Sequence, residues 1–206
     1  YGRDVVGLYP ILPDDTCCFL AIDFDDGAWK ENVSAVRKVC AAWEIPCAVE
    51  RSRSGEGAHL WIFFSEPLPC FTARKLGSAL LTAAMEQEGS LKLDAYDRMF
   101  PCQDMLPSGG FGNLIALPLQ GQARKKGNSV FVDEAFVPYP DQWAFLCETK
   151  KINADDVERI IKQHTHGDAL GTLCSAEPAE KPWEKKRKPQ LSPLDFIGVQ
   201  KITRAN

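Results

Sequence analysis

Apolar and polar positions along the chain follow two different periods, which predict helices and strands in turn. Apolar residues at helical spacing predict amphipathic helices over 28–43 and 71–88, a short helix over 143–147 and a last helix that Asn153 caps. Compact apolar runs predict strands over 17–22, 45–50, 60–64, 113–119 and 129–132, with a polar turn at 121–128 between the last two. Strand–helix–strand order followed by further strands predicts an α+β domain with a mainly antiparallel sheet flanked by helices.

The composition changes near residue 167, where the periodic segments end. We expect residues 1–167 to form one folded domain. Residues 168–193 are polar and contain several prolines, which is typical of a linker, and 194–206 read as the start of a further segment or a tail. The chain begins with Tyr1 rather than Met, so we expect a piece of a longer protein, covalently linked to further domains.

Composition excludes several classes of protein. The 206 residues are 45% apolar, which suffices for one packed domain, and no run of about 18 apolar residues predicts a membrane span. Eight cysteines are scattered without a C-x-x-C pair, which favours reduced thiols and a cytoplasmic location, with a zinc site left open. A net charge of −4 argues against a wholly basic nucleic-acid-coating protein but leaves room for a local basic groove.

The first buried run ends in two aspartates, Asp23 and Asp25. Because successive strand side chains point to opposite faces, these carboxylates share one face and Phe24 packs on the other. Like charges at that spacing repel unless a cation lies between them, and hard oxygen ligands favour Mg²⁺ or Mn²⁺. The alternative is a strand that ends in an acidic turn, with Asp26 capping the next helix.

A second motif is the Gly- and Ser-rich loop 51–59, which leads into an apolar strand. Gly57 allows the backbone to approach an anion closely, Arg53 adds charge, Ser54 adds a donor, and His59 can donate to a phosphate oxygen. The loop lacks the Gly-Lys-Ser/Thr of a Walker A motif. The alternative is a flexible hairpin loop with a surface histidine.

A third carboxylate beside the first pair would complete a two-metal site. Asp94, Asp97 and Asp104 qualify by residue type, and each could equally be an ordinary loop aspartate. Further along, Lys125 and Lys126 lie in a basic turn that could hold phosphates or simply be solvated.

The order of these motifs resembles the catalytic core of the archaeo-eukaryotic primase superfamily over about residues 5–150. The closest resemblance is to the primase-polymerase domains of CRISPR-associated operons and conflict systems. It implies a primase-polymerase catalytic domain with an RRM-like element. The family's Asp-x-Asp metal pair falls on Asp23 and Asp25, and its Ser-x-His signature falls on 57–59, with Gly57 in the place of Ser and with Ser54 as an alternative hydroxyl.

The resemblance also ranks the candidates for the third carboxylate. In plasmid-type members an aspartate precedes a Gly-Gly pair, five residues before the first glycine and six before the second, and the pair leads into a strand that ends in proline. Asp104, with Gly109, Gly110 and Pro118, fits this spacing, so it is preferred and Asp97 is held in reserve.

The implied function is template-directed nucleotidyl transfer. A 3′-hydroxyl would attack the α-phosphate of a dNTP or NTP on a single-stranded DNA template with a primer, assisted by two Mg²⁺ or Mn²⁺ ions. The alternatives are a metal-dependent nuclease or phosphodiesterase and a non-catalytic nucleic-acid-binding module. De novo priming, the choice between dNTP and NTP, and the oligomeric state stay open at this stage.

Overall fold

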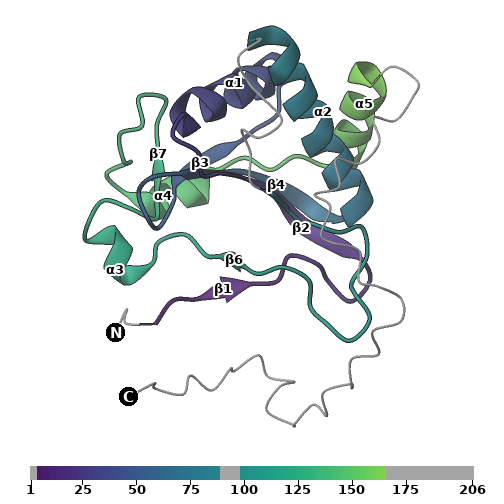
Figure 1. Cartoon of the computed structure of the whole chain (residues 1–206). Coiled ribbons are helices and arrows are strands. Elements are labelled where there is room, and N and C mark those ends of the chain that lie inside the picture. Colours follow the sequence, from purple (N-terminus) through teal and green to yellow (C-terminus); the bar gives the residue numbers. More distant parts are fainter. Residues whose placement is uncertain (1–3, 89–97, 166–206) are drawn as a thin grey trace. The chain divides into compact units, whose positions relative to one another are not determined.

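The computed structural model of the chain describes residues 4–88 and 98–165. They contain strands and helices of very different lengths (Figure 1). In chain order the elements are β1 (Gly7–Leu8), β2 (Thr16–Phe24), α1 (Trp29–Ala42), β3 (Ala48–Arg51), β4 (Ala58–Pro69), α2 (Cys70–Glu88), β5 (Arg98–Phe100), β6 (Ile115–Ala116), α3 (Gly121–Arg124), β7 (Val130–Val132), α4 (Gln142–Glu148) and α5 (Ala154–His164).

The main sheet has the strand order β5-β2-β4-β3-β7, and all its neighbouring strands are antiparallel. Along the chain, β2-α1-β3-β4-α2-β5 is a βαββαβ unit. Its four strands lie in the order fourth, first, third, second, which is the split βαβ arrangement of an RRM-like element. The predicted α+β fold with an antiparallel sheet is therefore confirmed.

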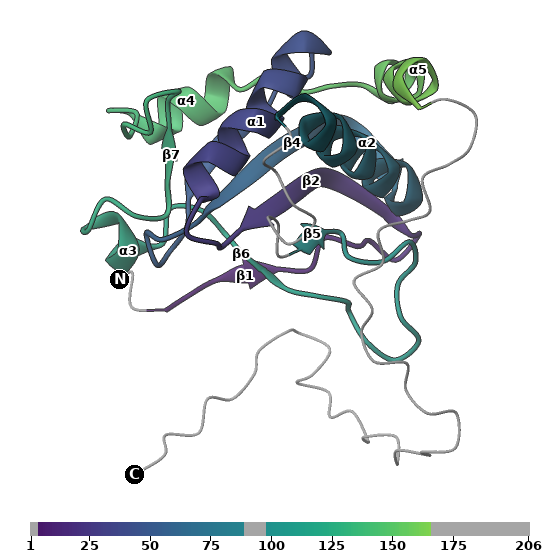
Figure 2. The same cartoon turned by 45° about the horizontal axis from the view of Figure 1, so that its top comes forward.

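Helices cover one face of this sheet. Helices α1, α2 and α5 lie together above it (Figures 1 and 2), and their apolar side chains join those of the strands in the larger core cluster. On β2 the alternation assigns Leu20, Ile22 and Phe24 to this cluster, whereas Phe19 and Ala21 belong to a smaller cluster on the other face. Asp23 continues the second series, so its side chain belongs to the face opposite α1, α2 and α5, where α4 (Phe145 and Leu146) packs against the smaller cluster.

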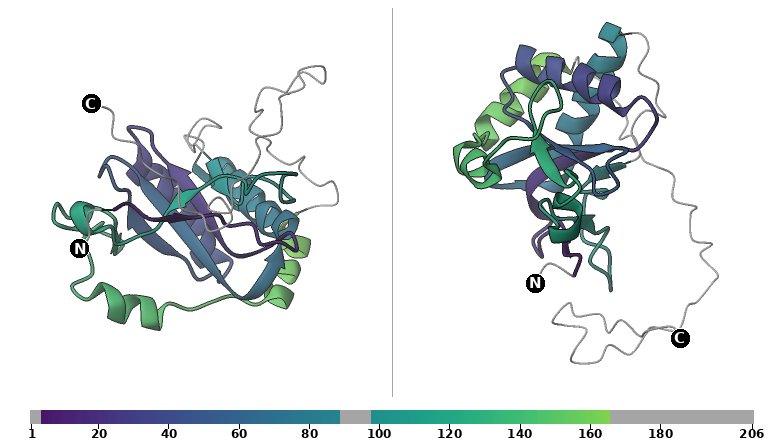
Figure 3. Two further views of the ribbon diagram at one scale, coloured as in Figure 1. Left: turned by 90° about the horizontal axis from the view of Figure 1, so that it is seen from below. Right: turned by 90° about the vertical axis from the view of Figure 1, so that its left-hand side faces the viewer.

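A two-stranded ribbon of β1 and β6 covers part of that other face (Figure 3). Leu8 and Ile115 of the ribbon pack into the smaller cluster. The buried side chain of Gln120 fixes the ribbon, because it accepts a hydrogen bond from Val6 N and donates to Val6 O and Leu117 O at 2.6–3.1 Å. The ribbon is thus held at a defined position on the sheet.

The predicted helices occur within one or two residues of the expected bounds, and Asn153 caps α5 by accepting a hydrogen bond from Asp156 N. Other segments differ. Strand β4 continues to Pro69, only two residues of the run 113–119 pair as a strand, and the predicted turn 121–128 contains α3. Within the described residues, no helix is long and apolar enough to cross a membrane.

The chain divides into two units, 1–173 and 174–206. The predicted linker 168–193 and the segment 194–206 lie outside the described residues. The boundary at residue 167 therefore stays a prediction.

Candidate functional site

The antiparallel pairing of β2 with its two neighbours brings separate sequence motifs together. Asp23 on β2 lies opposite His59 on β4 on one side and opposite Arg98 on β5 on the other. The acidic motif and the histidine motif, which are 36 positions apart in the sequence, are therefore direct cross-strand neighbours. Their spacing is set by the sheet and not by a loop.

These motifs line one cavity of about 410 Å³. Its walls come from the end of β2, the loop between β3 and β4, the start of β4, and parts of β5 and β6. The lining residues are Asp23, Asp25, Ser52, Arg53, Ser54, His59, Arg98, Phe100, Leu114, Ile115 and Ala116. The structure thus gathers both aspartates and three of the six predicted nucleotide-binding residues (Arg53, Ser54 and His59) around a single space, which we call the Asp23 cavity.

A buried carboxylate that sequence reasoning missed, Glu50 on β3, holds the histidine. Glu50 is only 2% exposed, and its Oε2 lies 2.9 Å from His59 Nδ1 and accepts a hydrogen bond from Trp61 Nε1 at 3.1 Å. Its Oε1 accepts a hydrogen bond from Ser129 Oγ at 3.1 Å. With one ring nitrogen held in this way, His59 directs Nε2 toward Asp23.

Two carboxylates set the charge of His59. Burial alone would lower the pKa of the imidazole, but the carboxylates of Asp23 and Glu50 outweigh it and raise the pKa to about 10. The ring is therefore a cation at neutral pH, donating from Nδ1 to Glu50. A fixed positive charge that lines a cavity is suited to an anionic ligand.

One oxygen of Asp23 is left without a hydrogen bond. His59 Nε2 lies 3.3 Å from Asp23 Oδ1, close enough for an ion pair, but the contact does not meet the geometry of a hydrogen bond. Among the described residues, no group donates to this buried Oδ1. A carboxylate oxygen that accepts no hydrogen bond, beside Asp25 in the same cavity, is of the type that binds a hard divalent cation such as Mg²⁺ or Mn²⁺. Residues 4–88 and 98–165 contain no group of three side chains that could hold a metal.

Gly57 stands where the chain passes closest to the acidic motif. A Cβ atom at this position would lie 2.4 Å from Asp25 Oδ1 and 2.6 Å from Phe24 O, so the backbone leaves no room for a side chain. The hydroxyls of Ser52 and Ser54 lie nearby on the cavity wall, with their Oγ atoms 2.9 Å apart. The hydroxyls therefore come from the preceding turn and not from position 57.

Comparison with families of known proteins gives one match over most of the chain. Residues 1–160 match the model of the archaeo-eukaryotic primase (AEP) domain of the TOTE conflict system. The chain belongs to this family. The match extends over every strand described above and into α5, and it confirms the resemblance to conflict-system primases. No curated protein matches the chain. Domains of the AEP family are typically primases or polymerases, which use divalent metals and act on nucleotides and nucleic acids.

The structure of this AEP domain corrects the role predicted for Asp104. Asp104 Oδ1 lies 2.5 Å from Nη1 of Arg74, a buried side chain on α2. Nearby, Leu106 N donates to Asp15 Oδ1, and Asp15 directly precedes β2. Since Asp15 is eight positions before Asp23 and a strand rises roughly 3.3 Å per residue, the Asp104 region lies about 25 Å from Asp23. Asp104 is thus an ion-pair partner of α2, and it is too distant to share a cation with Asp23 and Asp25.

The remaining candidates fall into two groups. Asp94 and Asp97 lie outside the described residues. Lys126 lines a neighbouring cavity of about 200 Å³ together with Arg53, which therefore borders both cavities. Lys125 is exposed, and its Nζ lies 3.4 Å from Gln122 Oε1. The structure thus connects Lys126 to the site of this AEP domain through Arg53, and it places Lys125 outside the residues that line these two cavities.

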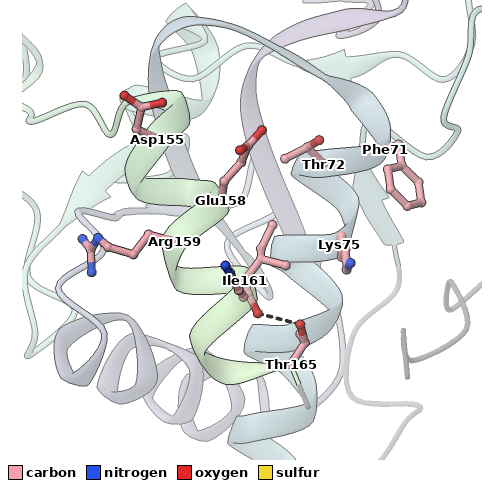
Figure 4. A pocket seen from close by; sticks show the side chains of 9 residues that line it. Phe71, Thr72, Lys75, Asp155, Glu158, Arg159, Ile161 and Thr165 are labelled. Carbon is pink, nitrogen blue, oxygen red and sulfur yellow. Dashed lines mark hydrogen bonds between the residues drawn. The ribbon is translucent and has the colours of Figure 1, made fainter. Parts of the chain in front are cut away.

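A larger cavity, of about 670 Å³, contains none of the predicted site residues. Side chains of α2 and α5 line it, among them Phe71, Lys75 and Glu158, together with Thr165 just after α5 (Figure 4). Helices α2 and α5 lie on one face of the sheet (Figure 1), and the alternation of β2 assigns Asp23 to the other face. Size alone therefore does not identify the face of this AEP domain that carries the predicted site residues.

Proposed function

We propose that this AEP domain is a DNA primase-polymerase that adds dNTPs or NTPs to a 3′-hydroxyl, directed by a single-stranded DNA template. The observation that carries the proposal is the Asp23 cavity. It joins a carboxylate pair, two serine hydroxyls, two arginines and a cationic histidine within one space. That combination suits a triphosphate with an associated divalent cation.

The basic and hydroxyl groups would bind the triphosphate. His59 lines the cavity with its ring held by Glu50, and Arg53 adds a positive charge at the border with the Lys126 cavity. Ser54 offers a hydroxyl on the same wall. The rigid attachment of His59 to Glu50 makes it a positioning group, because a ring that is already oriented loses little conformational entropy when the nucleotide binds.

Asp23 and Asp25 would hold the divalent cation, Mg²⁺ or Mn²⁺. Bound there, the cation would lower the pKa of the attacking 3′-hydroxyl and neutralise charge on the phosphates. A two-ion form needs one more carboxylate. Asp97 is our proposal for it, because it directly precedes Arg98, whose backbone lies opposite Asp23.

The test is a primer-extension assay with a labelled primer on a single-stranded DNA template, Mn²⁺ or Mg²⁺, and nucleotides. The wild-type protein should lengthen the primer. The double substitution Asp23→Asn with Asp25→Asn should reduce extension by at least about a hundredfold, because a metal ion contributes several kcal/mol to such a transition state and 1.36 kcal/mol is a factor of ten. Asp155→Asn, an exposed substitution on α5, is the matched control and should extend normally.

The same assay separates the alternatives. A shortened primer would indicate a nuclease, and an unchanged primer that is nevertheless bound would indicate a non-catalytic binding module. Full extension by the double variant would contradict the proposed role of the two aspartates.

A further inference from the structure

Exposed apolar side chains gather on the β1/β6 ribbon and the residues next to it. Their exposed fractions lie between 42% and 57%. We call this set the ribbon patch, and it consists of Val5, Val6, Tyr9, Phe111 and Leu114. Single exposed apolar residues are ordinary, but several on one small element mark a surface that contacts something.

The ribbon patch contains a preformed aromatic pair. The rings of Tyr9 and Phe111 lie with centroids 5.2 Å apart and planes inclined by 34°. Their support is rigid, since Leu8, the neighbour of Tyr9, is packed under the sheet and Gln120 clamps the backbone of Val6. Exposed rings held at a fixed position can stack on a planar partner at low entropic cost.

The ribbon patch reaches the Asp23 cavity at Leu114. Leu114 belongs to both, and Phe111 precedes it by three residues. Arg53 and Arg98 line the same cavity, so positive charge borders one end of the patch. Apolar rings next to arginines suit a polyanion with planar bases better than a purely apolar partner, because such an anion would use both features.

We propose that Tyr9 and Phe111 form a stacking platform for bases of the single-stranded template as it approaches the Asp23 cavity. The inference rests on the proposed function for the identity of the strand. Stacking on aromatic rings is tolerant of base identity, which a strand of arbitrary sequence requires. The platform would hold the template while Arg98, on the cavity wall, attracts its phosphates.

The first experiment measures the affinity for a fluorescein-labelled oligothymidylate by fluorescence anisotropy, using the whole chain. Tyr9→Ala with Phe111→Ala should weaken binding by about tenfold or more, within the range found for loss of base–aromatic stacking. Tyr9→Phe and Phe111→Tyr should bind as the wild type does. Phe71→Ala removes an equally exposed phenylalanine on α2, on the helix-covered side, and is the control that should change nothing.

A second probe isolates the bases from the phosphates. An abasic oligonucleotide of the same length keeps the charge and lacks the rings, so wild type and double variant should bind it equally. The variant Tyr9→Leu with Phe111→Leu keeps apolar volume without aromatic faces. It should lose affinity for oligothymidylate while keeping the thermal unfolding midpoint, which separates stacking from a folding defect.

Equal oligothymidylate affinity of the wild type and the leucine variant would overturn the platform. The platform would also be overturned if the double variant lost as much affinity for the abasic oligonucleotide as for oligothymidylate. A wild-type dimer that becomes monomeric in the leucine variant, with DNA affinity unchanged, would assign the patch to a second copy of the chain and would also overturn it. Primer extension by the wild type is scored separately, so the platform can fail while nucleotidyl transfer stands, and the reverse.

Discussion

The two faces of the central sheet are built in different ways. On the helix-covered face, α1, α2 and α5 pack apolar side chains such as Leu80 and Ile22 against the strands, and the interactions are non-directional. On the ribbon face the apolar cluster is smaller, and it adjoins the charged group of Glu50, His59 and Asp23. The larger apolar core thus lies on one face, and the candidate site residues gather on the other.

This contrast explains why the two faces should respond differently to substitution. Apolar packing depends on volume and tolerates similar side chains, whereas a buried charge is stable only with its specific partners. A change on the helix face should alter stability more than nucleotide binding. A change at Glu50, His59 or Asp23 on the ribbon face should alter nucleotide binding more than stability.

The largest loss of stability is expected on the helix face. Leu80→Ala, at a fully buried position of α2, should lower the free energy of unfolding by about 2–5 kcal/mol, because it removes contacts and leaves a cavity. Urea unfolding measures the loss. Nucleotide affinity below the unfolding transition should be unchanged, and a weakened affinity there would contradict the division of roles between the faces.

Gly57→Ser should test the closest approach on the ribbon face. This substitution introduces the serine of the family motif, but its Cβ would clash with Asp25 Oδ1 and Phe24 O. We expect a loss of about 1–3 kcal/mol in unfolding free energy, typical of overpacking, together with weaker nucleotide binding. The control is Gly110→Ser, where a Cβ would meet only Pro107 Cγ at 3.6 Å. Improved nucleotide binding by Gly57→Ser would show that the loop can move away.

Glu50→Gln should change the pH dependence of stability. In the metal-free protein the pKa of His59 is raised from 6.5 to about 10, so its contribution to stability is fully present below pH 6.5 and is lost as the pH rises toward 10. Without the Glu50 charge the folded-state pKa should fall, and the decline between these pH values should be smaller. Urea unfolding in EDTA at pH 7 and pH 9.5 measures it, and NMR titration of His59 reports the pKa. An unchanged decline would remove Glu50 as the cause.

The smallest effect is expected for Asp104→Asn. It should lower stability by about 1 kcal/mol, because Asn can still accept a hydrogen bond from Arg74 at this partly exposed position. Primer extension should be unchanged, since Asp104 lies near the far end of β2. Asp97→Asn, measured beside it, should reduce extension strongly. The opposite pattern would restore Asp104 as the third carboxylate.

The sequence predicted the helix-covered face better than the ribbon face. Helices such as α1 and α5 carry their own signals, a helical spacing of apolar residues and the Asn153 cap, which depend only on neighbouring residues. Strands β1 and β6 are two residues long, too short for any period to be visible. They form because β1 pairs with β6 and because Leu8 and Ile115 pack against the sheet.

The candidate site was predictable where the motif adjoins the end of a long strand. Asp23 and His59 belong to strands whose apolar character predicts their alternation. Glu50 was missed because its burial depends on three partners from other segments, His59, Trp61 and Ser129. Asp104 misled because its spacing to a Gly-Gly pair does not indicate which end of β2 it reaches.

The cross-strand pairing of Asp23 with His59 also bears on how this site could be lost in evolution. An insertion or deletion that shifted β4 by one residue would place Ala58 or Leu60 opposite Asp23 and turn the histidine to the other face of the sheet. That face is packed with apolar side chains, so the shifted register would bury a charge there. Insertions and deletions in this hairpin should therefore cause misfolding and be selected against. Family members that have lost activity should instead carry substitutions at the site and keep the pairing register of β2 and β4.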